Sequence, residues 1–322
     1  MKAVVYRSYG SVSVLALEER ERPALGEGEL LVRVVAAALN PKDVLVRKGK
    51  YKVLTGRNFP RLLGYDYAGQ VVECGPSAGA FASGDRVFGM IQAWNGGACA
   101  EYVTVRATEC AHMPESLSWE EAAAMPLAAQ TALQALRDLG RVRADSRVLI
   151  NGASGGVGTF AIQIAKILGA HVTAVSSAAN DALCRELGAD ETIDYRAASP
   201  FASATRYDVI FDVFGNRTFS EARSALAPRG IYVTTVPSIR SFVDVAMSFA
   251  AAQRARVIVV HSKTADLEYL AARANEGRLR SVIHQVFDMD EIQAASTQIE
   301  TKRTRGKVVL RVQPQLAADP LV

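Results

Sequence analysis

The sequence predicts an α/β protein that combines a doubly wound parallel sheet with a partly antiparallel, barrel-like region. From Arg147 onward, apolar strands and helices alternate, which is typical of a parallel sheet covered by helices on both faces. A glycine-rich loop at residues 151–158 joins the first of these strands to a helix. Before Ser118, by contrast, short apolar runs are separated by Gly, Pro and Asp, a pattern of short strands and turns.

The chain of 322 residues is long enough for two domains. Because the alternating unit lies in the middle of the chain, the C-terminal segment must return to complete the first domain. We therefore expect a first domain at residues 1–122, a central domain at 123–262 and a return segment at 263–322.

Each expected element follows from a local signal. Ser118 followed by Glu121 is a capping box, and the Ala-rich stretch behind it predicts a helix over 119–139. Gly169 and Gly188 each close a helix of the central domain, since glycine readily adopts the conformation of a helix end. The expected strands are 30–35, 69–72, 102–105, 148–150, 171–175, 209–213, 231–236 and 307–312, and the other expected helices are 159–168, 180–187 and 266–275.

The composition excludes several classes of protein. With 37 Lys+Arg against 33 Asp+Glu and no long basic run, the chain lacks the positive surface that a nucleic-acid partner requires. The four cysteines are scattered and form no C-x-x-C pair, so we expect neither a disulfide framework nor a metal site. The N-terminus alternates like a strand, without the apolar core of a signal peptide. The longest apolar stretch, 242–260, is interrupted by charges, so we expect no membrane partner and a cytoplasmic location.

The glycine loop is the strongest functional signal. Glycines between a strand and a helix let the backbone approach a pyrophosphate, whose charge then lies at the helix N-terminus. Ala153 replaces the first glycine of the usual G-x-G-x-x-G pattern, while Gly155 and Gly158 are kept. The predicted dinucleotide-binding residues are Gly152, Ala153, Ser154, Gly155, Gly156, Val157 and Gly158.

Two other phosphate-binding classes do not fit this loop. A kinase-type P-loop would continue with Gly-Lys-Ser/Thr, which is absent here. A short-chain dehydrogenase needs a Tyr-x-x-x-Lys pair, and none of the ten tyrosines has a lysine four residues later.

The end of the second strand of the central domain bears on the choice of cofactor. An NAD site usually has Asp or Glu there, about twenty residues beyond the glycines, to bind the ribose hydroxyls. Here the strand ends in Ser176 and Ser177, whose small side chains leave room for a 2′-phosphate. Asp181 fits better as a first-turn helix residue, and Arg185 is the nearest cation. We therefore expect NADPH rather than NADH.

A set of motifs spread over nearly the whole chain resembles the zinc-free quinone oxidoreductase (ζ-crystallin-like) branch of the medium-chain dehydrogenase/reductase superfamily. The resemblance implies a GroES-like catalytic domain and a Rossmann domain. Besides the glycine loop, the motifs are 39–43 (LNPKD), 47–51 (RKGKY), 60–69 (PRLLGYDYAG), 84–87 (GDRV), 96–102 (GGACAEY), 126–132 (PLAAQTA), 187–190 (LGAD), 193–195 (IDY) and 306–310 (GKVVL).

The same resemblance indicates that this chain lacks the zinc ligands of related enzymes. Zinc alcohol dehydrogenases of the superfamily have a cysteine at the position of Asn40 and Gly-His-Glu at the positions of Gly64, Tyr65 and Asp66. They also carry a cysteine quartet for a structural zinc, which this chain lacks. Without a zinc Lewis acid, plain alcohol dehydrogenation is not expected. Asp66 is expected to support the local turn or a neighbouring basic group.

The resemblance implies hydride transfer from NADPH to a small-molecule acceptor, either a quinone or an α,β-unsaturated carbonyl. Such acceptors need little acid catalysis, because the negative charge delocalises onto an oxygen. Two alternatives remain open: an enoyl-thioester reductase, and a nucleotide-binding protein with a structural role. By the same resemblance we expect a homodimer joined along the edge of the Rossmann sheet.

Four further site residues come from the resemblance. Asn40 matches an asparagine whose amide could donate to the substrate carbonyl; alternatively, Asn40 and Pro41 only make a turn, with Asp43 capping the next helix. Tyr51 matches an active-site tyrosine. Thr131 matches a threonine near the nicotinamide carboxamide; alternatively, it is only a packed residue of its helix. Tyr195 matches a residue that lines the adenosine 2′-phosphate; alternatively, it is an ordinary tyrosine at a strand end.

Overall fold

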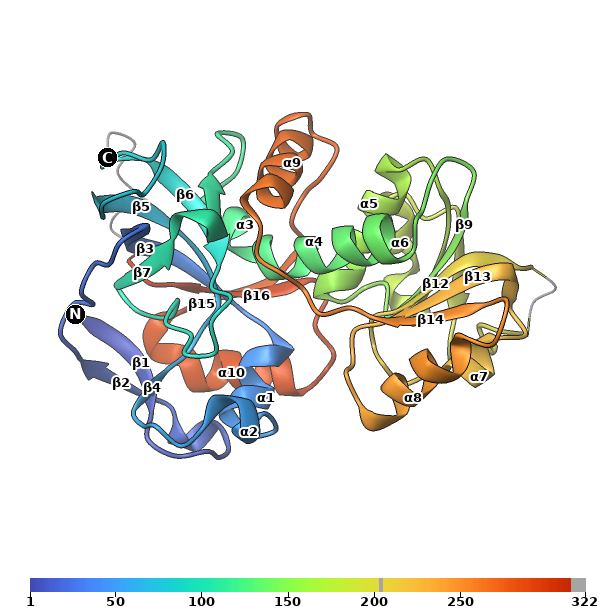
Figure 1. Cartoon of the computed structure of the whole chain (residues 1–322), viewed down its shortest axis with the longest axis horizontal. Coiled ribbons are helices and arrows are strands. Elements are labelled where there is room, and N and C mark those ends of the chain that lie inside the picture. Colours follow the sequence, from blue (N-terminus) through green and yellow to red (C-terminus); the bar gives the residue numbers. More distant parts are fainter. Residues whose placement is uncertain (203–204, 314–322) are drawn as a thin grey trace. The chain divides into compact units, whose positions relative to one another are not determined.

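The computed structural model describes residues 1–202 and 205–313, and they form two compact units (Figure 1). One unit is Met1–Leu127 together with the segment from Ser262 onward, and the other is Ala128–His261. These borders lie close to the expected ones at residues 122 and 262. The last part of the expected return segment, 314–322, lies outside the described residues.

The first unit is built on two sheets. The smaller has the strand order β2-β1-β4, and the larger has the order β15-β16-β3-β5-β6-β8, with β7 also paired to β3. Most pairings in both sheets are antiparallel, and only β15 and β16 are parallel neighbours. The strands are β1 Lys2–Tyr6, β2 Ala16–Glu19, β3 Glu29–Leu39, β4 Arg61–Leu62, β5 Asp66–Cys74, β6 Arg86–Met90, β7 Tyr102–Arg106, β8 Cys110–His112, β15 Ile283–Asp288 and β16 Lys307–Arg311.

The return of the C-terminal segment to the first unit is confirmed by the pairing of β16. This strand runs antiparallel to β3, with Val308 opposite Leu39 and Arg311 opposite Ala36. The central strand β3 is almost wholly buried, as its run of Val, Leu and Ala side chains predicts. Gly69 of β5 allows close packing here, because a Cβ atom at this residue would lie 2.2 Å from the Arg33 carbonyl oxygen.

Short helices complete the first unit. The capping box is confirmed: the Ser118 hydroxyl accepts from the Glu121 N–H, and the Glu121 carboxylate accepts from the Ser118 N–H. The α-helices are α1 Pro41–Arg47, α2 Lys52–Thr55, α3 Trp119–Ala124, α9 Thr264–Asn275 and α10 Ile292–Glu300, and the 3₁₀ turns are Val12–Val14, Ala107–Glu109 and Met289–Glu291.

The single helix expected over 119–139 is instead three segments. After α3 the chain forms α4, Pro126–Leu133, and then a π-helical turn, Gln134–Leu139. Pro126 explains the first break, because proline has no N–H to donate to the preceding turn. The prediction of one continuous helix was therefore wrong, although the helical character was right.

The second unit contains a six-stranded parallel sheet of order β11-β10-β9-β12-β13-β14, which confirms the predicted Rossmann-type sheet. The order of strands changes direction at β9. The chain first adds β10 and β11 on one side of β9, and then crosses over to add β12, β13 and β14 on the other side. Such a switch point is where nucleotides bind in open parallel sheets. The elements are β9 Arg147–Asn151, β10 His171–Ser176, β11 Glu191–Asp194, β12 Tyr207–Asp212, β13 Leu226–Thr234, β14 Arg254–Val257, α5 Gly156–Ile167, α6 Asp181–Glu186, α7 Phe219–Ala222, α8 Ile239–Ser248 and a 3₁₀ turn Ala178–Asn180.

The apolar stretch 242–260 contributes most of α8 and all of β14. Within the described ranges, no helix combines the length and the apolar character needed to cross a bilayer.

Candidate active site

The glycine loop lies at the switch point of the sheet, between β9 and α5. Gly152 has a φ of +85°, a left-handed conformation that favours glycine. Gly158 lies in the first turn of α5, where a Cβ atom would come within 2.2 Å of the Gly152 carbonyl oxygen. These two glycines are therefore required by the fold of the loop itself.

Gly155 has a different environment. It is the N-cap of α5, and a Cβ atom built there would meet only the Gly152 carbonyl oxygen, at 3.5 Å. The first N–H groups of an α-helix have no acceptor within the helix, and they attract anions. Gly155, Gly156 and Val157 are partly exposed, so this end of α5 fits a pyrophosphate. Ala153, in contrast, is fully buried and donates its N–H to the Val175 carbonyl, so it can act on a cofactor only by shaping the loop.

The end of β10 carries small polar groups. The Ser176 hydroxyl donates to the Ser177 carbonyl oxygen at 3.2 Å. The Asn180 amide bridges the Ser154 hydroxyl at 2.9 Å and the Ser177 hydroxyl at 3.2 Å, which ties the glycine loop to the strand end. The nearby acid, Asp181, lies in the first turn of α6 as expected.

Asp181 is also neutralised locally. Its carboxylate pairs with Arg185 at 3.0 Å and accepts from the Thr192 hydroxyl, and these contacts lower its pKa. Arg185 is therefore already paired with an acid.

Arg196 is a further cation beside the end of β10 that sequence reasoning did not single out. Its neighbour Tyr195 donates its N–H to the Ser176 carbonyl at 3.1 Å, so both residues follow β11 beside the end of β10. The Tyr195 ring is about half exposed, and the Arg196 guanidinium lies 5.6 Å from its centroid. The signal in the sequence was a Tyr-Arg pair directly after the strand that neighbours β10.

A buried carboxylate organises the neighbouring loop. Asp212, at the end of β12, is fully buried and accepts from the Asn151 amide at 2.7 Å and the Tyr232 hydroxyl at 2.8 Å. It also accepts from the N–H groups of Gly215, at 2.9 Å, and Arg217, at 3.0 Å. These bonds fix the loop after β12 on the opposite side of the switch point from β10. Sequence reasoning did not find this cluster.

Thr131 lies in α4 of the second unit and is buried. Its predicted contact with the nicotinamide carboxamide stays a prediction.

In the first unit, four polar side chains form a buried network at the end of β3 and the start of α1. The Lys307 ammonium donates to the Asn40 amide oxygen and, at 3.1 Å, to Asp66. The Asn40 amide nitrogen donates to the same Asp66 oxygen at 2.9 Å. Asp43 accepts from the N–H groups of Asn40, at 2.7 Å, and Gly64, at 3.1 Å. The second oxygen of Asp66 accepts a further N–H bond, at 2.9 Å, from the chain at residue 127.

This network defines what Asn40 can do. The residue is 2% exposed, its amide hydrogens point to Asp66 and the Ala38 carbonyl, and its oxygen accepts from Lys307. Of the two alternatives for this residue, the helix-capping contact with Asp43 is present. Donation to a substrate carbonyl would require one of these amide contacts to break. The expectation that Asp66 supports a basic group is confirmed by Lys307.

Burial dominates the electrostatics of the network. It raises the pKa of Asp43 to about 7, against the lowering effect of the Asn40 N–H. It also raises the pKa of Asp66, although the Lys307 ammonium opposes this. Both carboxylates therefore depend on donors and on Lys307 to remain ionised.

Tyr51 lies beside a second group of residues that the sequence did not indicate. Its ring centroid is 5.3 Å from that of Trp94. The Lys42 ammonium lies 3.7 Å from the Tyr65 ring centroid and 5.1 Å from that of Trp94. Such cation–π contacts stabilise a positive charge that is largely withdrawn from water. Burial nevertheless lowers the pKa of Lys42 and raises that of Tyr51.

Comparison with known proteins decides the family. Two family models match: the alcohol dehydrogenase GroES-like domain at residues 26–115 and the zinc-binding dehydrogenase model at residues 187–310. The chain is 33% identical to the mitochondrial NAD(P)H oxidoreductase RTN4IP1 of Danio rerio, over 97% of this chain and 91% of that protein. It belongs to the medium-chain dehydrogenase/reductase family.

Other relatives point to the same branch of this family. The 2-methylene-furan-3-one reductase of Solanum lycopersicum is 36% identical over 98% of this chain and 80% of its own length. The structure of the quinone oxidoreductase from Coxiella burnetii superposes with a TM-score of 0.91 at 32% identity, covering 97% of this chain and 99% of that one. These matches confirm the resemblance to the quinone oxidoreductase branch.

Although one matching model describes zinc-binding dehydrogenases, the residues at the family's catalytic zinc position do not fit the metal. They are an amide, Asn40, a phenol, Tyr65, and a single carboxylate, Asp66. The Lys307 ammonium already bonds to the oxygens of Asn40 and Asp66. Zinc sites use thiolate, imidazole and carboxylate ligands, and a cation at the same oxygens would repel the metal. In this chain Asn40 and Asp66 therefore bind an internal ammonium instead of supplying zinc ligands.

Proposed function

We propose that this NAD(P)H-dependent oxidoreductase transfers hydride from NADPH to a quinone or an α,β-unsaturated carbonyl without zinc. The observation that carries the proposal is the open N-terminus of α5 at Gly155, combined with the Lys307 ammonium that bonds to Asn40 and Asp66, the residues at two of the family's zinc-ligand positions. The printed names of the relatives, quinone oxidoreductases and a furanone reductase, support the same acceptor class.

The preference for NADPH is supported by charge at the adenosine end. β10 itself ends in Ser176 rather than in an acid, and the nearby Asp181 is paired with Arg185. Ser177 and Asn180 offer polar groups, and Arg196 offers a guanidinium that could bind a 2′-phosphate.

When bound, NADPH supplies the hydride, and the protein has to hold the acceptor and stabilise the negative charge that develops on its oxygen. We propose that Tyr51 and Trp94 hold the flat acceptor by ring contact. Lys42 is a cation beside this pair, and its ammonium contacts the Tyr65 and Trp94 rings. A positive charge in such a partly dry setting stabilises an oxyanion more strongly than it would in water.

We further propose a cytoplasmic homodimer. In the described part of the chain, β14 pairs only with β13, so its outer edge is available for another strand. Light scattering coupled to size-exclusion chromatography should give twice the mass of 34.5 kDa. A monomer at micromolar concentration would contradict this.

The proposed reaction can be tested by stopped-flow oxidation of NADPH with 1,4-benzoquinone, 9,10-phenanthrenequinone and crotonyl-CoA. We expect turnover with the quinones. Preferential turnover of crotonyl-CoA would instead support an enoyl-thioester reductase. No turnover with any acceptor, while calorimetry shows that NADPH binds, would refute the enzymatic proposal.

A further inference from the structure

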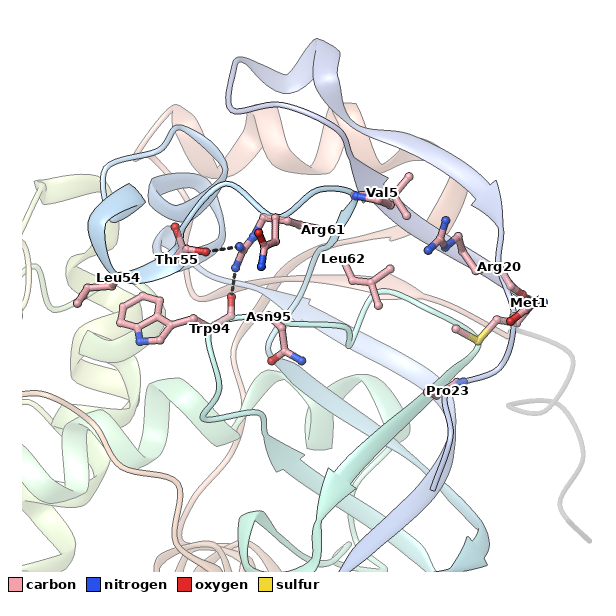
Figure 2. A pocket seen from close by; sticks show the side chains of 13 residues that line it. Met1, Val5, Arg20, Pro23, Leu54, Thr55, Arg61, Leu62, Trp94 and Asn95 are labelled. Atoms are coloured by element: carbon pink, nitrogen blue, oxygen red, sulfur yellow. Dashed lines mark hydrogen bonds between the residues drawn. The ribbon is translucent and has the colours of Figure 1, made fainter. Parts of the chain in front are cut away.

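The first unit contains a cavity of about 660 Å³, within the range of small-molecule sites (Figure 2). Trp94 and Leu54 lie at one end, Met1 and Arg20 lie at the other, and Arg61 and Leu62 lie between them. All lining residues belong to the first unit. Of the residues that line it, the proposed function uses only Trp94.

The cavity and the proposed acceptor site share Trp94. Trp94, which lines the cavity, is in ring contact with Tyr51 at 5.3 Å. Leu54 and Thr55 also line it, and both belong to α2, for which Tyr51 is the N-cap. An occupant that lies against Trp94 is therefore a neighbour of Tyr51.

Arg61 is an unusual wall residue, because its charge is buried without a counter-charge. The side chain is 8% exposed, and its guanidinium donates to the carbonyls of Thr55, at 2.6 Å, and Trp94, at 2.8 Å (Figure 2). Its Nε has no hydrogen-bond partner, and no carboxylate of the described residues lies within 4.0 Å of it. Arg61 acts electrostatically on the phenols of Tyr6 and Tyr65, but burial raises the pKa of both, so they are neutral.

The other charges in the lining leave a net positive cavity. Arg20 is exposed, and none of the described carboxylates pairs with it within 4.0 Å. Glu21 is the acid among the lining side chains, and it is exposed. A buried guanidinium without an anion is costly, and an anionic ligand group would offset that cost. Near Trp94 the wall combines apolar side chains, Leu54, Leu62 and Pro60, with uncharged polar ones, Thr55, Asn58 and Asn95.

We propose that this cavity binds an organic anion, a carboxylate or sulfonate on a flat apolar body, with the body against Trp94 and the anion at Arg61 and Arg20. The inference rests on the proposed function in one respect, because the anion that binds in the cavity is a group on the acceptor itself. Binding to the cavity and turnover are therefore tested separately.

Binding is tested without cofactor, using the two tryptophans as reporters. The protein labelled with 5-fluorotryptophan has two ¹⁹F resonances, from Trp94 in the cavity and Trp119 in α3, and Trp119→Phe assigns them. Titration with 2-naphthoate should shift the Trp94 resonance alone. The neutral isostere 2-naphthamide should bind at least about fivefold more weakly, because one charge-assisted contact is lost. Equal affinity for the two probes, or no shift of Trp94, would overturn the proposal.

Two variants and a control locate the anion. Arg20→Gln should reduce the preference for 2-naphthoate over 2-naphthamide by about threefold or more, since Arg20 is exposed and partly screened. Arg57→Gln removes the same charge from an exposed residue outside the lining, and should change the preference by less than about twofold. Arg61→Met should abolish the preference if it folds. An unchanged preference in Arg20→Gln and in a folded Arg61→Met would overturn the assignment.

The acceptor is tested with 1,2-naphthoquinone-4-sulfonate and 1,2-naphthoquinone. Arg20→Gln should lower kcat/KM for the sulfonate relative to the neutral quinone by about threefold or more. An unchanged ratio would overturn the statement that the cavity holds the acceptor's anion. If neither quinone is reduced but 2-naphthoate still shifts Trp94, the proposed function fails and the anion site stands.

Discussion

The Lys307 ammonium and the Asp66 carboxylate, 241 positions apart in the chain, meet at 3.1 Å in the core of the first unit, where they are 4% and 0% exposed. Both also bond to Asn40. The contact joins β16 of the return segment to β5, with β3 between them. It therefore links the two parts of the chain that make up the first unit.

Removal of one partner should leave an unpaired buried charge. Lys307→Met is expected to lower the free energy of unfolding by about 3–5 kcal/mol. The double variant Lys307→Met/Asp66→Asn should lose less than Lys307→Met alone, because the stranded carboxylate is gone. Urea unfolding of the single and double variants measures this coupling. If the loss in the double variant equals the sum of the losses in Lys307→Met and Asp66→Asn, the ion pair is contradicted.

Asp43 should make stability fall as the pH rises. Its pKa in the folded protein is about 7, above the ordinary 3.8, so between these values the folded state holds more protons than the unfolded state. The contribution of Asp43 to the free energy of unfolding declines by up to about 1.4 kcal/mol per pH unit from pH 4 to 7. We expect the free energy of unfolding, measured with urea at pH 5 and pH 7, to fall less or rise more with pH in Asp43→Asn than in the parent protein. Parallel pH profiles would show that Asp43 titrates normally.

The glycine loop offers a matched pair of substitutions. Gly155→Asp has room for its side chain and adds a negative charge at the phosphate position, so it should abolish NADPH binding and keep the melting temperature. Gly158→Ala forces a methyl group to within 2.2 Å of the Gly152 carbonyl and should lower the melting temperature. Calorimetric titration and thermal unfolding distinguish the two effects. Unchanged NADPH affinity in Gly155→Asp would remove the loop from the cofactor site.

Arg196 should determine part of the cofactor preference. Arg196→Gln is expected to reduce the ratio of NADPH to NADH affinity by about tenfold, since it loses one charge-assisted phosphate contact. Arg185→Gln is the control, because Arg185 pairs with Asp181. An equal effect of both substitutions would point to general charge rather than to a specific contact.

Tyr51 should matter for turnover more than for cofactor binding. Tyr51→Ala removes the ring that contacts Trp94 and should lower kcat/KM for the acceptor by about tenfold or more, with NADPH affinity unchanged. Tyr51→Phe keeps the ring and separates the role of the ring from that of the hydroxyl. Kinetics of Tyr51→Ala equal to those of the parent would place Tyr51 outside the site.

The parts of the site that follow from local sequence could be predicted. The glycine loop, the capping box at Ser118 and the absence of an acid at Ser176 and Ser177 each depend on a few consecutive residues. α5 begins at Gly156, three residues before the expected start, because the loop glycines themselves form its first turn.

The remaining parts depend on which strands become neighbours. Lys307 meets Asp66 only because β16 pairs with β3 in a specific register, and no local pattern reveals that register. Arg196 lies beside Ser176 because β11 pairs with β10. Lys42 contacts the rings of Tyr65 and Trp94. Both rings belong to other segments of the chain, so no local pattern predicts this contact.

We propose that this chain reduces activated carbonyl acceptors with NADPH and needs no zinc. Oxidation of NADPH by 9,10-phenanthrenequinone tests this directly, using protein dialysed against a chelator and assayed in EDTA. We expect acceptor-dependent oxidation at the same rate with and without EDTA. Oxidation that EDTA abolishes and added zinc restores would contradict the proposal.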